Sequence, residues 1–147
     1  MRVVYTAGVW DLLHRGHLNV LWESKKLGDV LVVGVVSDAG CFQYKRTMPA
    51  QHVQARVRAV QALGFVDVVV EQVTTDPTDN LRQFAPEVFT HADGKGEWGT
   101  LRARVEALGI EYVNLPYSDA VTSTELRSRR FGNGNATQEE ARDASVT

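Results

Sequence analysis

The sequence predicts a Rossmann-like α/β fold: a doubly wound, parallel, five-stranded sheet with helices on both faces. Short β-branched runs alternate with helical apolar stripes along most of the chain. The run Val30–Val36 is apolar throughout, which is typical of a strand covered on both faces. Strands that alternate with helices require crossover connections, and such connections make a sheet mainly parallel.

The predicted elements alternate from the beginning of the chain. Residues 3–6 form a short first strand, and the helix after it places Leu18, Leu21 and Trp22 on one face, with Gly28 suited to end it. A second helix follows the strand Val30–Val36, and its apolar stripe consists of Val53, Val57, Val60 and Leu63. The later elements are a strand at 66–70, a helix at Thr78–Phe84, a strand at 87–90, a helix at 101–108 and a strand at 110–115.

The length of 147 residues matches a single domain that can bury its own core. We assign this domain to residues 1–131, because the sequence shows no internal repeat and no second periodic region. Residues 132–147 are rich in small and polar side chains and lack apolar periodicity, so we expect a disordered tail there.

Composition argues against several classes of partner and site. The formal net charge of −2 argues against general affinity for nucleic acid, and no apolar run is long enough to cross a bilayer. The beginning of the chain lacks the pattern of a secretion signal, so we expect a cytoplasmic protein. Cys41 is the only cysteine, which excludes an internal disulfide and a thiolate metal cage.

The segment between the first strand and the first helix holds the residues suited to chemistry, because ligands of such sheets bind beyond the carboxyl ends of the strands. Gly8 can let the backbone approach a ligand just before a helix amino terminus, which favours phosphate. His14 and His17 are three residues apart, so both imidazoles can face one phosphate, and Gly16 leaves space beside them. Donors placed in this way stabilise the charge on a phosphoryl group in transfer.

The run His14-Arg15-Gly16-His17, preceded by Gly8 and Asp11, resembles the HxGH signature of the nucleotidyltransferases. The wider sequence is most similar to the bacterial glycerol-3-phosphate cytidylyltransferases, over roughly the first 130 positions. The segments that carry this resemblance further along the chain are Lys26-Leu27-Gly28-Asp29, Ser37-Asp38, Phe65-Val66-Asp67, His91-Ala92-Asp93 and Thr122-Ser123-Thr124.

The resemblance implies that His14 and His17 contact the nucleotide phosphates while an acceptor phosphate attacks the alpha-phosphorus and pyrophosphate leaves. Lys45, in the polar loop expected after the second strand, is implied as a third catalytic group. The implied acceptor contacts are Lys45, Arg46 and Arg56, although Arg56 can equally be a salt-bridged helix residue. The implied nucleotide contacts are Ala7, Gly8, Val9, Trp10, Asp11, His14, Gly16, His17, His91, Asp93, Thr122, Ser123 and Thr124.

Two positions depart from the glycerol-3-phosphate enzymes. Gly64 and Tyr117 stand where that family has arginines, each of which would help to hold a phosphate. The heptose-phosphate adenylyltransferases also resemble the chain, and they have an aromatic residue where Tyr117 stands. Thr122 and Glu125 also fit a capping box at the start of a last helix, a structural role compatible with phosphate binding nearby.

We therefore expect a nucleotidyltransferase that transfers CMP from CTP to a small phosphorylated alcohol such as glycerol 3-phosphate and releases pyrophosphate. The resemblance implies a homodimer, and Mg²⁺ held mainly by the nucleotide phosphates rather than by protein ligands. The alternatives are an adenylyltransferase acting on a sugar phosphate of the heptose type or on FMN, and a non-catalytic nucleotide-binding regulatory module. An NAD-dependent oxidoreductase is disfavoured, because no Gly-x-Gly-x-x-Gly follows the first strand.

Overall fold

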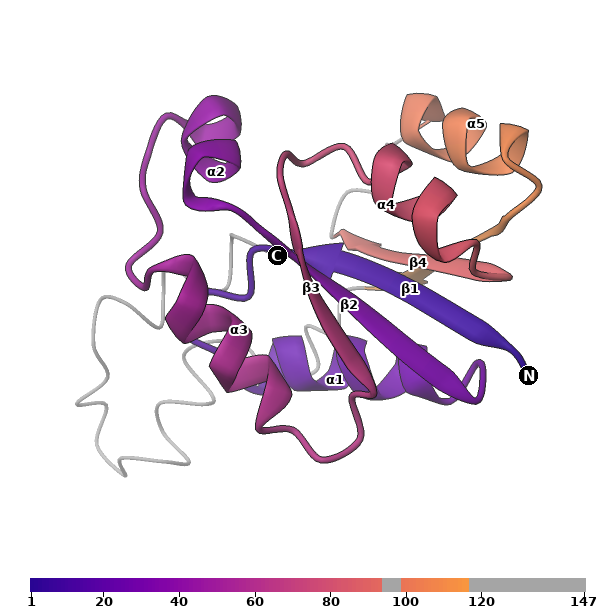
Figure 1. Cartoon of the computed structure of the whole chain (residues 1–147), viewed down its shortest axis with the longest axis horizontal. Helices are drawn as coiled ribbons and strands as arrows, with labels where there is room; N and C mark the ends of the chain where they lie inside the picture. The colour runs from indigo at the N-terminus through magenta and orange to yellow at the C-terminus, as the bar shows by residue number, and fades with distance from the viewer. Residues whose placement is uncertain (94–98, 117–147) are drawn as a thin grey trace.

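Five strands form one parallel sheet in the order β3-β2-β1-β4-β5 (Figure 1). The computed structural model describes residues 1–93 and 99–116 of the chain. The elements in chain order are β1 (Val3–Gly8), α1 (Arg15–Lys25), β2 (Val30–Val36), α2 (Asp38–Lys45), α3 (Val53–Gln61), β3 (Val68–Gln72), α4 (Thr78–Phe84), β4 (Val88–Asp93), α5 (Gly99–Ala107) and β5 (Glu111–Pro116).

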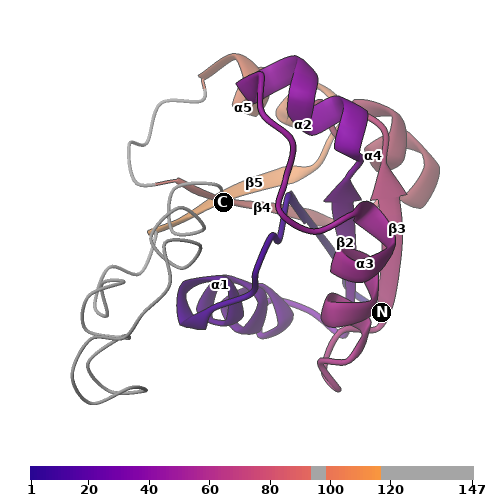
Figure 2. The same cartoon turned by 90° about the vertical axis from the view of Figure 1, so that its left-hand side faces the viewer.

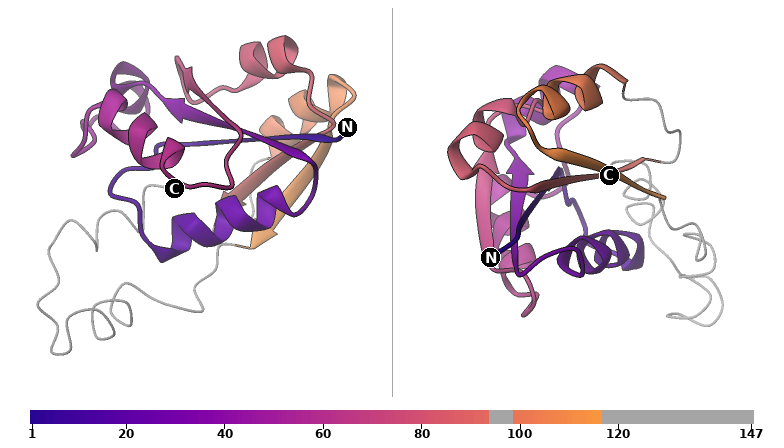
Figure 3. Two further views of the ribbon diagram at one scale, coloured as in Figure 1. Left: turned by 60° about the horizontal axis from the view of Figure 1, so that its bottom comes forward. Right: turned by 90° about the vertical axis from the view of Figure 1, so that its right-hand side faces the viewer.

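The sheet is built outward from β1, its central strand. β1 pairs in parallel with β2 and with β4, and the outer pairings of β2 with β3 and of β4 with β5 are parallel too. The chain first moves from β1 through β2 to β3, and then returns to the other side of β1 for β4 and β5. The direction of winding therefore reverses between β1 and β4, which confirms the predicted doubly wound sheet. Figure 3 shows how strongly the strands twist relative to one another.

Helices cover both faces of the sheet, as predicted (Figures 1 and 2). On one face α1 and α3 contribute Val20, Leu21, Val53 and Val60 to a core with the inward valines of β1 and β2. On the other face α4 and α5 contribute Leu81, Leu101 and Val105 to a core with Tyr5 and Phe89. Each fully buried side chain of this size contributes about 1.5–3 kcal/mol relative to an exposed one.

Buried hydrogen bonds join α1 to β4, and β4 to β1, the two strands between which the winding reverses. Ser24 Oγ on α1 lies 2.7 Å from Thr90 Oγ1 on β4, and Thr6 Oγ1 on β1 donates to the Thr90 carbonyl. All three side chains are buried, so each of these bonds lies where water cannot replace it. Ser24 lies in the last turn of α1, so these bonds fix the carboxyl end of the helix against the sheet.

The segment that follows β2 differs from the prediction, which had Lys45 and Arg46 in a polar loop. Residues 38–45 form the helix α2, so Lys45 is its last residue and Arg46 is its carboxyl cap in the left-handed conformation. Ser37 begins the helix as its N-cap, accepting a hydrogen bond from the Gly40 amide. The sequence of this helix shows no apolar stripe, because its large apolar side chains, Phe42 and Tyr44, are exposed instead of facing the core.

Smaller differences concern element ends and one aromatic residue. β3 begins two residues later than predicted, because the Val66 amide still bonds to Leu63 in a turn. Trp22 is 49% exposed and packs edge-on against Phe65 instead of entering the core. The proposed tail and the capping box at Thr122 lie outside the described residues. Among residues 1–93 and 99–116, no helix has the length and apolar character needed to span a membrane.

Candidate active site

The loop from Val9 to His14 leaves the carboxyl end of β1, next to the point where the winding reverses. Ligands of doubly wound sheets bind at this place. Trp10 and Leu12 in this loop have φ values of 55° and 51°, in the left-handed region that non-glycine residues rarely adopt. Each such residue costs about 1 kcal/mol or more, so neighbouring contacts must hold the loop in this shape.

The side chain of Trp10 makes one of the contacts that hold the loop. Its side chain is fully buried, and its indole N–H donates to the Gly34 carbonyl of β2 at 3.0 Å. A Cβ at Gly8 would lie 2.8 Å from Trp10 Cε2, so Gly8 is required for the packing of this ring. The sequence suggested that Gly8 leaves room for a ligand; in the structure the indole of Trp10 occupies the space beside it.

A second contact joins the loop to the segment between α2 and α3. Asp11 is buried, and its two carboxylate oxygens accept the amide hydrogens of Ala50 at 2.7 Å and Gln51 at 2.9 Å. In return, Gln51 Oε1 accepts from the Leu12 amide at 2.9 Å. We call these three hydrogen bonds the loop clamp. Gln51 was not among the residues predicted from the sequence, since no motif or periodicity distinguishes it.

His14 and His17 lie together at the amino end of α1 and cap it with their rings. His14 Nδ1 accepts from the Gly16 amide at 2.9 Å, and His17 Nδ1 accepts from the His14 amide at 3.3 Å. This is the reciprocal arrangement of a capping box, with imidazoles in place of the usual hydroxyl and carboxylate. The two rings are stacked, with centroids 4.1 Å apart, and Trp10 meets His17 edge-on at 5.7 Å.

The cap decides which nitrogen of each ring carries the proton. A neutral imidazole has one N–H and one acceptor nitrogen, and Nδ1 is the acceptor in both rings. Each neutral ring therefore has its proton on Nε2 and can donate from that atom. Burial, with the nearby charge of His14, holds the pKa of His17 well below its usual value of 6.5, so His17 is neutral at physiological pH.

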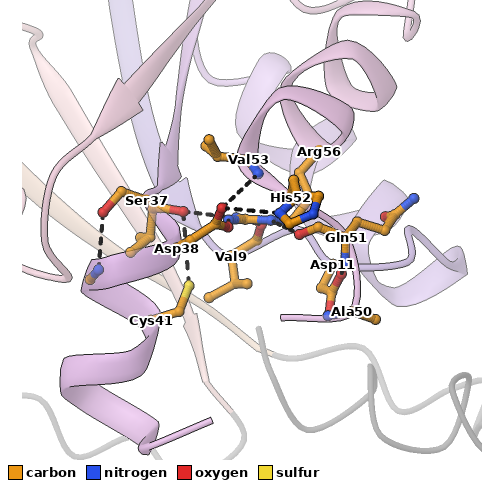
Figure 4. Close-up of polar contacts among 12 residues, drawn as sticks. Val9, Asp11, Ser37, Asp38, Cys41, Ala50, Gln51, His52, Val53 and Arg56 are labelled. Carbon is orange, nitrogen blue, oxygen red and sulfur yellow. Dashed lines mark hydrogen bonds and ion pairs between the residues drawn. The ribbon is translucent and has the colours of Figure 1, made fainter. Parts of the chain in front are cut away.

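Arg56 on α3 is placed very differently from a surface cation. Its side chain is 0% exposed, and Nη1 donates to the carbonyls of Val9 at 2.7 Å and Val36 at 2.8 Å. Nε donates to the Gln51 carbonyl at 2.9 Å, and Nη2 pairs with Asp38 Oδ1 at 2.7 Å (Figure 4). The guanidinium thus joins the end of β1, the end of β2 and the segment before α3. This placement matches the salt-bridged helix residue that the sequence left open as one of two roles.

Asp38 completes this group at the start of α2. Partial burial acts to raise the pKa of its carboxyl group, but hydrogen bonds from Arg56 and from the Val53 amide outweigh burial and bring the pKa below its usual value. The carboxylate is therefore ionised at neutral pH and balances the buried guanidinium. His52 beside it is 87% exposed, with Nδ1 3.6 Å from Asp38 Oδ2.

The remaining predicted contacts are spread around the carboxyl edge. Lys45 and Arg46 are exposed at the end of α2. The loop clamp joins the segment after them to the loop from Val9 to His14, the histidine loop. His91 lies near the end of β4 on the face that carries α4 and α5, where its Nδ1 is 3.2 Å from the Tyr112 hydroxyl. Asp93 ends β4, and its side chain is not described. Residues 117 and 122–124 lie outside the described residues.

Gly64 lies at the opposite edge of the sheet from the histidines. It is in the turn between α3 and β3, where the strands begin, and the space around its α-carbon is open. An arginine at this position would begin far from the loop at the carboxyl end of β1. Its absence therefore changes the charge at the amino edge of the sheet rather than beside His14 and His17.

Metal ligands among the described residues are few. Residues 1–93 and 99–116 contain no group of three or more His, Cys, Asp or Glu side chains that could hold an ion. The carboxylates of Asp11 and Asp38 at this edge already accept hydrogen bonds from backbone amides, and Asp38 also pairs with Arg56. A metal ion here would need most of its ligands from a bound molecule.

Comparison with known proteins places this chain in a family. A family model described as cytidylyltransferase-like matches residues 5–129. The bifunctional protein HldE of Desulfatibacillum aliphaticivorans is 34% identical over 127 residues, 85% of this chain and 26% of the relative. The protein of the same name from Streptomyces coelicolor is 36% identical over 129 residues, 86% of this chain and 28% of the relative. The chain thus spans about a quarter of the length of these curated relatives.

Solved structures with the same fold are also similar to the chain. The lipopolysaccharide core biosynthesis protein from Thermoplasma volcanium GSS1 is similar with a TM-score of 0.69 and 31% identity, over 80% of this chain and 97% of that one. The pantoate-beta-alanine ligase from Francisella tularensis, at 14% identity and a TM-score of 0.58 over 78% of this chain and 59% of its own, shares the fold. The family match over residues 5–129 shows that the chain belongs to the cytidylyltransferase-like family.

Proposed function

We propose that the protein transfers a nucleoside monophosphate unit from a nucleoside triphosphate to a sugar phosphate and releases pyrophosphate. The observation that carries the proposal is the pair of stacked, buried histidines at the amino end of α1, both held with Nδ1 as acceptor and Nε2 as donor. Two imidazole N–H donors beside a helix amino terminus are suited to a phosphate that gains charge during transfer. Membership of the cytidylyltransferase-like family supports the same chemistry.

In the proposed reaction, an oxygen of the acceptor phosphate attacks the alpha-phosphorus, and the bond from this phosphorus to the pyrophosphate oxygen breaks. Nε2–H of His14 and of His17 donate to the phosphate oxygens on which charge develops. Because His17 is neutral, it contributes a directed hydrogen bond rather than a full positive charge. The capping bonds at Nδ1 hold both rings before substrate arrives, so little reorganisation is needed at the moment of transfer.

Cations for the remaining phosphate charge come, in this proposal, from Lys45 and Arg46 at the end of α2 and from magnesium. A magnesium ion bound with the nucleotide would neutralise charge on the phosphates. The engaged carboxylates of Asp11 and Asp38 fit an ion coordinated mainly by phosphate oxygens. His91, Asp93 and residues 122–124 remain proposed nucleotide contacts.

The acceptor is proposed from the relatives. The solved structure of 31% identity is that of a lipopolysaccharide core biosynthesis protein, and this core is built of sugars. This supports a sugar phosphate as the acceptor. The resemblance to the heptose-phosphate adenylyltransferases suggests a heptose phosphate, with ATP as the donor. Transfer of CMP from CTP to glycerol 3-phosphate is the second candidate, supported by the family's description and by the sequence resemblance.

Pyrophosphate release tests the proposal across a panel that pairs ATP and CTP with hexose and heptose phosphates, glycerol 3-phosphate and FMN, in the presence of Mg²⁺. Turnover with ATP and a sugar phosphate supports the first candidate, and turnover with CTP and glycerol 3-phosphate selects the second. Nucleotide binding without turnover on any acceptor would contradict the enzymatic proposal and favour a regulatory module.

Two variants of His14 separate catalysis from helix capping. His14→Asn retains a side-chain oxygen suited to an N-cap but loses the Nε2 donor, whereas His14→Ala loses both. We expect turnover to fall by about 100-fold or more in both, since one preorganised donor is typically worth this much. His52→Ala is the matched control, because His52 is 87% exposed, and its turnover should stay unchanged. Full activity in His14→Asn would refute the role of Nε2.

A further inference from the structure

Gln51 makes three hydrogen bonds, two to the histidine loop and one to Arg56 on α3. Its amide donates to Asp11 Oδ1 at 2.9 Å, its carbonyl accepts from Arg56 Nε at 2.9 Å, and its side-chain Oε1 accepts from the Leu12 amide at 2.9 Å (Figure 4). Both peptide groups that flank the Gln51 α-carbon are therefore held. A side chain that extends from a backbone held in this way has a defined direction.

The group that Gln51 holds is the amide of a residue in an unfavourable conformation. Leu12 has a φ of 51° and lies two residues before His14, which begins α1. A left-handed residue persists only where its surroundings determine its shape. The bond to Gln51 Oε1 fixes the peptide plane before Leu12, and hence the direction in which the chain enters the cap at His14.

We propose that Gln51 is a positioning residue for nucleotidyl transfer, which holds the Leu12 amide and thereby places the His14 and His17 rings. The inference rests on the proposed function for the role of the rings, and on the loop clamp for the role of Gln51. The bond spans 39 residues of sequence and joins the segment after Lys45 and Arg46 to the segment of the histidines. One side chain thus couples the two proposed phosphate-binding segments.

Three variants test the role of Oε1. Gln51→Met keeps the length of the side chain but loses the acceptor, and Gln51→Glu keeps an acceptor oxygen. We expect kcat to fall about 10-fold or more in Gln51→Met, with a smaller change in KM, because a displacement of about 1 Å in a catalytic group can cost up to 100-fold. Gln51→Glu should recover most of kcat. Gln61→Ala, at the exposed far end of α3, is the matched control and should match the unchanged chain.

Hydrogen exchange of the Leu12 amide gives a readout that does not need turnover. Loss of its acceptor should speed this exchange about 10-fold in Gln51→Met, while Gln51→Glu and Gln61→Ala stay close to the unchanged protein. Unchanged exchange in Gln51→Met, or an equal loss of kcat in Gln51→Glu, would overturn the inference. If the unchanged protein turns over no substrate pair, the proposed function fails, whereas the exchange data still decide whether Gln51 positions the loop.

Discussion

Replacement of Arg56 by methionine isolates the energetic role of the buried guanidinium. Methionine retains most of the apolar stem but removes the charge and every donor. The change breaks the 2.7 Å ion pair with Asp38 and leaves the carbonyls of Val9, Val36 and Gln51 without this donor. Arg58 offers a matched control, because it lies on the same helix and is exposed.

The expected loss follows from how completely each partner is buried. Removal of one member of a buried ion pair typically costs about 3–5 kcal/mol, and a buried acceptor left without a donor costs about 1–3 kcal/mol. Asp38 is 24% exposed, so water relieves part of its unpaired charge. We therefore expect Arg56→Met to lower the free energy of unfolding by about 3–5 kcal/mol. Arg58→Met should change it by less than about 0.5 kcal/mol.

Urea unfolding at pH 7, followed by circular dichroism and extrapolated to water, measures both values. The double variant with Asp38→Asn should lose less than the sum of the single losses, because the two changes remove the same ion pair. A loss in Arg56→Met within about 1 kcal/mol of that in Arg58→Met would refute the structural role. The guanidinium would then be available to an acceptor phosphate, the other role that the sequence left open.

Two further predictions concern packing and pH. Gly34→Ala should lower the free energy of unfolding by about 1–3 kcal/mol, because a new Cβ would overlap the Tyr5 hydroxyl. Gly64→Ala is the control: the space around Gly64 is open, so its free energy of unfolding should be close to unchanged. Thermal unfolding compares the two variants, and equal melting temperatures would contradict the packing argument. The pKa of His17 is lowered in the folded state, so the unfolded chain binds more protons than the folded protein below about pH 6.5. The free energy of unfolding should therefore fall on acidification from about pH 7 to about pH 5.5, and fall more in the unchanged protein than in His17→Gln. Urea unfolding at both pH values measures this difference, and equal pH dependence in the two proteins would show that His17 does not carry the effect.

Local patterns in the sequence were sufficient to predict the parallel sheet and most of the helices that cover it. Alternating apolar runs and helical stripes predict five strands and the helices α1, α3, α4 and α5, because their periodicities depend only on which side chains face a core. The spacing of His14 and His17 predicts that the rings meet at the start of α1, because positions three apart are neighbours on a helix. The short helix α2 was missed because it has no apolar stripe.

Contacts between distant segments decided the environment of the site. Whether Arg56 is a surface cation or a buried tether depends on the carbonyls of Val9 and Val36, which lie 47 and 20 residues away in sequence. In the same way, the Trp10 ring beside Gly8 and the bond from Leu12 to Gln51 exist only once β1, β2 and α3 have assembled. The sequence by itself determined which residues can do chemistry at this edge, and the tertiary structure decided which hydrogen bonds hold them there, since partners so far apart leave no local pattern.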